Sequence, residues 1–229
     1  MAAPLPTGTT KATAVREMFD TIAGRYEILN TVISLGMDRG WRLRCVEALA
    51  APPGSLVLDM ACGTGSLMRQ LRREGLRPIG LYISVGMLTH AGTDTPLVLG
   101  DALCAPLQTG SFDAAVSGFA LRNVVDLSGL FVELARVVRP GGRISLLELG
   151  EPEQAILRLG HRLWCSLLVP GLGALLSNGN AYRYLPASLA YLPCAGETTR
   201  LMREAGFVAV EHELLSGGIS QLYVGTRRQ

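Results

Sequence analysis

Two short turns in the sequence carry residue types that suit a nucleoside cofactor. The first turn, "DMACGTGS", ends an apolar run with a carboxylate at Asp59 and continues with two glycines. Gly63 and Gly65 permit unusual backbone angles and the close approach of a ligand. A helix that begins after them would offer free backbone N–H groups. The turn therefore predicts a cofactor site that includes Asp59, Gly63 and Gly65.

The type of cofactor follows from what the first turn lacks. A dinucleotide fingerprint requires G-x-G-x-x-G, but "GTGSLM" places Met68 where the third glycine should be. Asp59 would repel a phosphate, whereas it could receive a cationic amino group or orient the loop. S-adenosyl-L-methionine has an amino group and a sulfonium but no phosphate. We therefore expect S-adenosyl-L-methionine as the cofactor.

The second turn is "GDALC", which follows the apolar segment "PLVL". Asp101 could accept a hydrogen bond from an adenine amino group, and the amide of Ala102 could meet the edge of the ring. The alternative is purely structural, because Asp residues also form Asx-turns and cap helices. The presence of the first turn favours the cofactor interpretation.

Both turns need a scaffold, and apolar segments alternate with amphipathic ones along the chain. This alternation predicts βαβ units and a parallel sheet. We expect strands in five ranges: 55–61, 77–83, 96–100, 111–120 and 143–150. A helix closed by Pro-Gly-Gly is expected at 127–142, and a β-hairpin is expected at 207–226 around "SGG". The fold class is therefore α/β: a doubly wound, Rossmann-like, mostly parallel seven-stranded sheet with one reversed strand.

Other segments surround this core within one domain spanning residues 1–229. Residues 1–50 are expected to contain two helices, at 15–36 and 38–50, and residues 51–150 the cofactor-binding core. Residues 151–195 break the alternation and are interpreted as a helical cap inserted over the carboxyl edge of the sheet. Residues 196–229 supply a last helix and the hairpin.

Composition limits the function classes. The 229 residues are 48% hydrophobic and 17% charged, with a net charge of +2, and mean hydropathy is +0.30. This favours the handling of an apolar substrate and argues against nucleic acid as a partner. The cysteine and histidine spacings indicate neither a disulfide framework nor a metal site. The apolar stretch at 163–177 is too short to cross a bilayer, and no signal peptide is visible. We expect a cytoplasmic protein.

Five stretches resemble the ubiquinone/menaquinone-biosynthesis C-methyltransferases (UbiE/MenG type). Besides the two turns, they are "VREMFDTIAGRYEILNTVISLGMDRGWR", "FALRNVVD" with "RVVRPGGRISLLEL", and "NAYRYLP" with the C-terminal segments. The resemblance covers nearly the whole chain, and "LRNV" and "AYRYLP" are its most specific parts. It implies an enzyme that uses S-adenosyl-L-methionine to methylate a ring carbon of a prenylated quinol, typically demethylmenaquinol.

The resemblance also implies individual cofactor contacts, at Thr64, Asp101, Ala102 and Gly118, the last being a position where relatives often have serine. One position departs from the family. Its acidic residue at the end of the second strand falls on Tyr82, which Ile83 follows. A carboxylate there accepts bonds from both ribose hydroxyls, whereas a phenol makes one bond and is bulkier. We expect cofactor binding to survive but to be weaker.

Catalysis on carbon needs a ring made electron-rich by deprotonation of a neighbouring hydroxyl. The candidates for this are Arg122 and Asn123 of "LRNV", with Tyr26 and Tyr184 from the flanking segments. Arg122 would stabilise a phenolate or position a water, because arginine is a poor base. The structural alternative pairs Arg122 with Asp126 and uses Asn123 as a helix cap.

Two other functions stay open on the sequence alone. A methyltransferase of a small phenolic or secondary metabolite would keep the fold and cofactor, and a catalytically silent scaffold paralogue would explain Tyr82. The stretch at 163–177 could offer the prenyl tail an apolar wall or a route to the inner face of the membrane, or simply bury its own stripe. A homodimer is also left open.

Overall fold

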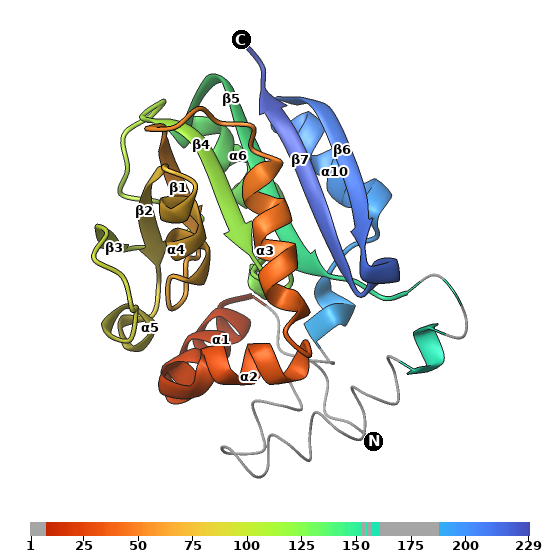
Figure 1. Ribbon diagram of the computed structural model, residues 1–229. Helices are drawn as coiled ribbons and strands as arrows, with labels where there is room; N and C mark the ends of the chain where they lie inside the picture. Colours follow the sequence, from red (N-terminus) through yellow and green to blue (C-terminus); the bar gives the residue numbers. More distant parts are fainter. Residues whose placement is uncertain (1–7, 153, 155–156, 161–187) are drawn as a thin grey trace.

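The computed structural model describes residues 8–152, 154, 157–160 and 188–229. They contain a seven-stranded sheet in the order β3-β2-β1-β4-β5-β7-β6 (Figure 1). The strands are β1 (Leu56–Met60), β2 (Arg77–Tyr82), β3 (Leu97–Leu99), β4 (Phe112–Gly118), β5 (Val138–Leu149), β6 (Phe207–Leu215) and β7 (Ser220–Arg227). β7 pairs antiparallel with both neighbours, and the other pairings are parallel. The predicted fold class, with its one reversed strand, is confirmed.

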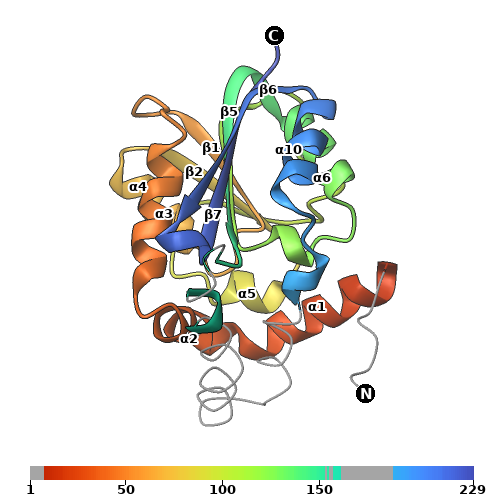
Figure 2. The same cartoon turned by 90° about the vertical axis from the view of Figure 1, so that its right-hand side faces the viewer.

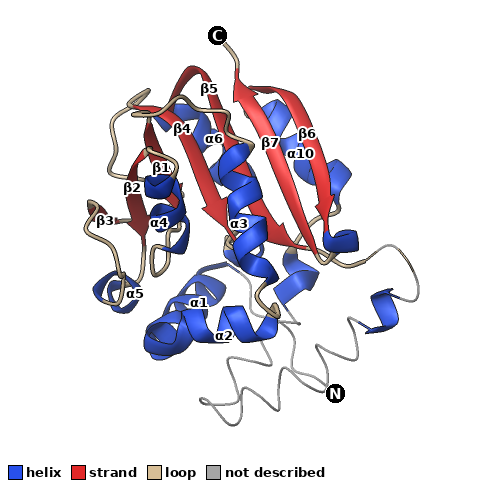
Figure 3. Ribbon diagram, viewed as in Figure 1, coloured by secondary structure: helices blue, strands red, loops and turns tan. Residues whose placement is uncertain are grey.

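Helices cover both faces of this sheet, as Figures 2 and 3 show. α3 (Met37–Glu47) and α4 (Ser66–Arg73) lie on one face, and α6 (Leu127–Val137) and α10 (Ala195–Glu204) lie on the other. The remaining helical segments are α1 (Gly8–Ile22), η1 (Ala23–Arg25), α2 (Tyr26–Ile33), α5 (Val85–Thr89), η2 (Leu121–Asn123), η4 (Leu189–Tyr191) and η5 (Ser216–Gly218).

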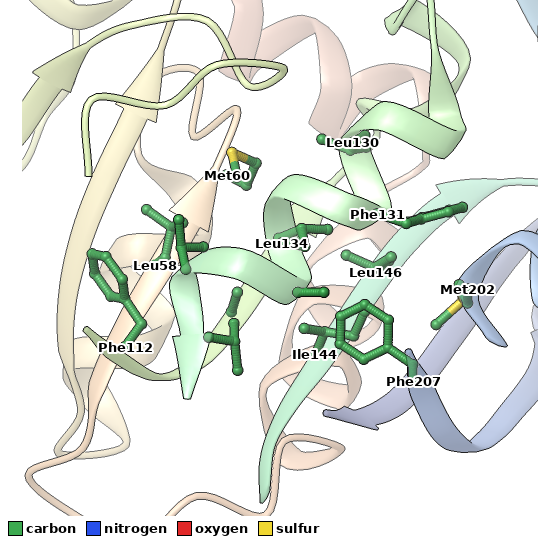
Figure 4. Packing of buried hydrophobic residues seen from close by; sticks show 14 of the residues in the cluster. Leu58, Met60, Phe112, Leu130, Phe131, Leu134, Ile144, Leu146, Met202 and Phe207 are labelled. Carbon is green, nitrogen blue, oxygen red and sulfur yellow. The ribbon is translucent and has the colours of Figure 1, made fainter. Parts of the chain in front are cut away.

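The hydrophobic core is divided by the sheet into two clusters. On the side of α6 and α10, Phe131 and Leu134 pack with Ile144, Met202 and Phe207 (Figure 4). On the opposite side, a second cluster joins α3 and α4 to the sheet through residues that include Trp41, Leu67, Leu71, Val116 and Leu147. The central strands β1, β4, β5 and β7 are thus mostly buried, whereas the edge strands β3 and β6 are half-buried or exposed along most of their length. This rigid sheet fixes the positions of the turns at its carboxyl edge.

The N-terminal helices lie across the edge of the sheet toward which β4 and β5 point (Figures 1 and 2). The sequence predicted one helix at 15–36, but the structure contains α1, η1 and α2. The break at Ala23–Arg25 includes Gly24, and glycine inside a helix costs about 1 kcal/mol relative to alanine. Val15, Phe19, Ile22 and Ala23 form a small core of their own with Met87.

A second correction concerns "RPGG". The expected helix at 127–142 ends at Val137, and Val138 already belongs to β5. The residue before a proline is disfavoured in the helical region, which excludes Arg139 from a helix. Gly142 instead lets β5 lie close to β4, because a Cβ atom there would lie 2.5 Å from the backbone oxygen of Asp113.

The expected cap can be followed only at its ends. Residues 161–187, which include Tyr184 and the apolar stretch at 163–177, lie outside the described residues. Among the residues that are described, none belongs to a helix with the length and apolarity to cross a membrane.

Candidate functional site

A pocket lies at the carboxyl edge of the sheet, where the turns after β1, β2, β3 and β4 meet α1. Ligands of doubly wound sheets bind at such edges, where the strand order changes direction. The structure brings these predicted residues to its wall: Asp59, Gly63, Thr64, Tyr82, Ile83, Asp101, Ala102, Gly118, Tyr26 and Asn123. Gly65 caps the start of α4 with φ 81° and stands beside the pocket rather than in its wall.

Asp59 is the most unusual residue of the pocket. Its side chain is 1% exposed, and neither carboxylate oxygen has a hydrogen-bond partner among the described residues. Burial raises the pKa of Asp59 to about 8, against smaller lowering effects of the Arg42 charge and the Met68 amide. A buried carboxylate without a partner is costly. Asp59 is therefore suited to receive a cationic group from a ligand.

The glycine turn is held by Glu27 of α2, a residue that sequence reasoning missed. Its carboxylate accepts hydrogen bonds from the hydroxyls of Thr64 (2.8 Å) and Ser66 (2.9 Å) and pairs with Arg69. Burial works to raise the pKa of Glu27, but these hydrogen bonds outweigh it and the pKa lies below its usual range. Thr64 thus has a structural partner as well as a place in the pocket wall. No local sequence signal links Glu27 to a turn that follows it by more than thirty residues.

At the second turn, the structural interpretation of Asp101 is confirmed, and its contact with the cofactor stays a prediction. Its Oδ1 accepts a hydrogen bond from the Leu103 amide at 2.9 Å, which makes an Asx-turn. The exposed side chain also lines the pocket beside Ala102. The turn that shapes the loop therefore leaves the second carboxylate oxygen available to a ligand.

Gly118 ends β4 against the first helix of the core. A Cβ atom at this position would lie 2.8 Å from Cδ1 of Leu67. A serine at this position would require Leu67 to move. The glycine therefore permits close packing of α4 on β4 at the pocket wall.

Arg122 makes a structural ion pair, but with another residue than the one named in the structural alternative. Its guanidinium pairs with the fully buried Glu148 of β5. Nε donates to Oγ of Ser188 at 3.1 Å, and Nη1 donates to the Phe119 carbonyl at 2.9 Å. Asp126, the partner in that alternative, accepts a hydrogen bond from Gly129 and caps α6. Arg122 is not among the described residues that line the pocket.

The remaining catalytic candidates divide into two groups. Tyr26 lies in the pocket wall, with its ring edge-on to Phe19 at 5.7 Å between centroids. Asn123 also lines the pocket, and its amide donates to the Phe119 carbonyl at 3.3 Å rather than capping a helix. Tyr184 lies outside the described residues. The structure thus places Tyr26 and Asn123 in the wall of one pocket, whereas Arg122 is not among the described residues that line it.

The residues of the pocket fit S-adenosyl-L-methionine. The unpartnered carboxylate of Asp59 suits an amino group, and the turn at Asp101 and Ala102 suits an adenine edge. Arg42 is the basic side chain among the described lining residues, and it pairs with Asp38 of its own helix. The described lining residues therefore include no unpaired basic side chain that could bind a phosphate.

Solved structures of other proteins share this fold. A SAM-dependent methyltransferase from Thermotoga maritima superimposes with a TM-score of 0.65 and 20% identity, over 93% of this chain and 99% of that one. Phosphoethanolamine N-methyltransferase 2 of Haemonchus contortus, in complex with S-adenosyl-L-methionine, gives a TM-score of 0.62 and 15% identity over 82% of this chain and 52% of that one. The fold is that of the methyltransferases.

Sequence comparison then specifies the family. The model of the ubiE/COQ5 methyltransferase family matches residues 7–227, and the chain belongs to this family. A demethylmenaquinone methyltransferase of Roseiflexus castenholzii is 39% identical over 98% of each chain. The C-methyltransferase UbiE of Syntrophotalea carbinolica is 38% identical over 93% of each, and a demethylmenaquinone methyltransferase of Mycolicibacterium vanbaalenii is 40% identical over 93% of this chain and 94% of that one. The predicted family and the predicted enzyme class are confirmed.

Proposed function

We propose that this protein methylates a ring carbon of a prenylated quinol, with demethylmenaquinol as the substrate and S-adenosyl-L-methionine as the methyl donor. The observation that carries the proposal is the pocket with Asp59 buried and unpartnered in its wall. The names of the relatives support the choice of quinol. S-adenosyl-L-methionine supplies an electrophilic methyl group when it is bound.

In this proposal the polar side of the pocket holds the cofactor. The ionised Asp59 carboxylate accepts hydrogen bonds from the amino group, and such bonds contribute about 1.5–3 kcal/mol. The Asp101 carboxylate accepts a bond from the adenine amino group, and the Ala102 amide faces the ring edge. Glu27 keeps the glycine turn in place through Thr64 and Ser66.

The quinol binds against the other side of the pocket. Val15 and Phe19 of α1, with Val124 and Val125 after η2, supply an apolar wall there. The hydroxyl next to the target carbon would first lose its proton to solvent, which makes the ring electron-rich. The carbon would then take the methyl group as the sulfur–methyl bond of the donor breaks, and the proton of that carbon would return to the oxygen. Tyr26 and Asn123 are placed to orient that hydroxyl, while Arg122 positions the η2 turn through its bonds to Glu148 and Phe119. Alignment of the two reactants contributes much of the acceleration.

The test is a methylation assay with the purified protein. Demethylmenaquinol with a prenyl tail and a tailless naphthoquinol are incubated separately with S-adenosyl-L-methionine, and the products are analysed by mass spectrometry. The proposal expects C-methylation, with the prenylated quinol preferred. Preference for the tailless phenol would support a small-metabolite methyltransferase instead. Cofactor binding without methylation of either quinol would support a silent paralogue.

We further propose that the protein meets its substrate at the inner face of the membrane, since the prenyl tail is a hydrocarbon. The large apolar side chains of Ile28 and Leu35 are 63% and 68% exposed, on and just after α2. Sedimentation with phospholipid vesicles tests this, and replacement of both residues by serine should reduce the bound fraction. The homodimer stays a prediction that light scattering can decide.

A further inference from the structure

Tyr82 stands between the two polar ends of the pocket. It ends β2, which lies between β1 and β3: Leu81 pairs with Met60 on one side, and Tyr82 pairs with Leu99 on the other. Asp59 lies at the end of β1, and the turn after β3 begins with Gly100, whose amide donates to the Tyr82 carbonyl at 3.0 Å. A nucleoside that reaches from Asp59 to Asp101 must cross the end of β2. The sugar of such a ligand therefore lies at Tyr82.

A strand end of this kind usually carries an acid. In dinucleotide-binding Rossmann folds, an Asp or Glu about 20 residues after the glycine turn accepts a hydrogen bond from a ribose hydroxyl. Here the position holds a phenol, and the carboxylates among the described lining residues are Asp59 and Asp101. Asp20 is near this strand end, but it accepts hydrogen bonds from the Ser84 hydroxyl and from the Gly86 amide at the start of α5. Asp20 is not among the described lining residues, and β2 itself offers no carboxylate at its end to hold both ribose hydroxyls.

The Tyr82 ring is fixed by aromatic contacts. It lies edge-on to Phe19, with 6.2 Å between ring centroids and 79° between planes. Phe19 in turn lies edge-on to Tyr26. The Tyr82 hydroxyl makes no hydrogen bond with the described residues, and burial raises the pKa of Tyr82 well above its usual value, so the phenol stays neutral. A neutral hydroxyl on a fixed ring can make one hydrogen bond to a sugar, whereas a carboxylate can accept two.

We propose that Tyr82 determines how this protein recognises the cofactor's ribose, and that it makes the site tolerant of adenosyl cofactors whose ribose lacks hydroxyls. The inference rests on the proposed function, because it assumes an adenosyl cofactor in this pocket. The expected specificity is a weak preference for ligands that have the 2′,3′-diol over ligands that lack it, and the Tyr82 phenol determines this preference. Neither the fold nor the family implies such a specificity.

Calorimetric titration of the whole protein tests the inference without turnover. The probes are S-adenosylhomocysteine and its 2′,3′-dideoxy analogue, and the measured quantity is the ratio of their dissociation constants. One neutral hydrogen bond contributes about 1 kcal/mol, so the wild-type ratio should be about tenfold or less. Tyr82→Phe removes the hydroxyl and keeps the ring against Phe19, and it should bring the ratio to within about twofold of unity.

Two further variants sharpen the result. Tyr82→Asp should raise the ratio several-fold above the wild type, since hydrogen bonds to a charged group are roughly twice as strong. It also places a charge beside Phe19, so its folding is checked by thermal unfolding, and Tyr82→Phe remains the deciding variant. Asp101→Asn is the matched control, because it keeps the turn at Leu103 and should leave the ratio unchanged.

Three results would overturn the inference. They are a wild-type ratio above about tenfold, a ratio that Tyr82→Phe leaves unchanged, and loss of the preference in Asp101→Asn, which would assign the diol to Asp101 instead. Failure of S-adenosylhomocysteine itself to bind would overturn the proposed function, and this inference with it.

Discussion

Two buried carboxylates near the carboxyl edge of the sheet have opposite surroundings. Glu148 at the end of β5 is fully buried and accepts hydrogen bonds from the amides of Arg122 (3.1 Å) and Leu149 (2.7 Å), besides its ion pair with Arg122. Asp59 at the end of β1 is 1% exposed and has no partner among the described residues. Burial at similar depth thus serves two purposes. Glu148 fixes the protein's own backbone, and Asp59 is kept for a group that arrives with a ligand.

The strongest way to break this comparison is to remove the partner of Glu148. Arg122→Ala leaves a buried carboxylate uncompensated, and breaking a buried pair costs about 3–5 kcal/mol. We expect a loss of this size in the free energy of unfolding, measured by urea denaturation. The matched control is Arg139→Ala, because Arg139 pairs with Asp113 at an exposed site, where its side chain is 57% exposed. Exposed pairs contribute about 0–1 kcal/mol.

Turnover should separate the roles of Arg122. If the residue only positions the η2 turn, Arg122→Lys should recover stability and turnover together. A variant that regains stability but not turnover would assign Arg122 a direct effect on the substrate, which is the role predicted from "LRNV".

The converse change is Asp59→Asn, which removes a charge that the ligand-free protein does not pair. We expect the affinity for S-adenosyl-L-methionine to fall by about 1.5–3 kcal/mol, the range for hydrogen bonds to charged groups. The ligand-free variant should nevertheless be more stable than the parent at pH 8, because the cost of burying the ionised carboxylate disappears. Titration calorimetry and thermal unfolding measure the two effects. A variant with parental affinity would show that Asp59 does not meet the ligand.

The pH dependence of the parent gives the same test without mutation. The folded pKa of Asp59 is raised to about 8 from an ordinary value of 3.8, so the folded state binds the proton more tightly than the unfolded state. Its contribution to stability is therefore present below about pH 4 and is lost as the pH rises toward 8. Cofactor binding needs the ionised form and should tighten as the pH rises from 6 to 8. Asp59→Asn should show no such tightening.

Asp101 is intermediate between Glu148 and Asp59. Its side chain is exposed, and one of its carboxylate oxygens accepts a hydrogen bond from the Leu103 amide. Asp101→Ala should weaken cofactor binding by about 1–3 kcal/mol through loss of a charge-assisted bond. Asp101→Asn keeps an oxygen for the Leu103 amide, so it should lose less. Equal losses in the two variants would attribute the effect to the charge alone, and wild-type affinity in both would make the turn purely structural.

The smallest expected effect concerns Glu27, whose side chain is 44% exposed in its pair with Arg69. Glu27→Gln keeps an acceptor for Thr64 or Ser66 and loses the charge. We expect cofactor affinity to fall by no more than about 1 kcal/mol, measured by calorimetry. Glu17→Gln on the exposed side of α1 is the control and should have no effect. A large loss would mean that the N-terminal helices must close on the glycine turn for binding.

The sequence was sufficient for the fold class and for the two turns that meet at the pocket, because both depend on local patterns. The strand of β1 and the glycines at 63 and 65 lie within ten residues of one another, and each can be interpreted without the rest of the chain. The ends of elements were less accurate. The helix expected to run to Pro-Gly-Gly stops at Val137, because the pairing of β5 with β4 takes over the following residues.

The pairing of charged residues could not be predicted in the same way. Sequence proximity suggested Asp126 as the partner of Arg122, but the fold brings Glu148 to it from 26 positions away. Glu27 reaches Thr64 across 37 positions. Such contacts depend on how whole elements pack, and a single sequence contains no signal for them. The roles of Tyr26, Asn123 and Tyr184 stay predictions.

The strand order has a consequence for how the protein is made. β7 follows β6 in the chain but lies between β5 and β6 in the sheet. When β6 emerges from the ribosome, β7 is still inside it, and β5 still has an open edge. Open strand edges readily pair with other chains. The interval ends when Ser220–Arg227 emerges as well and pairs with β5 and β6 together.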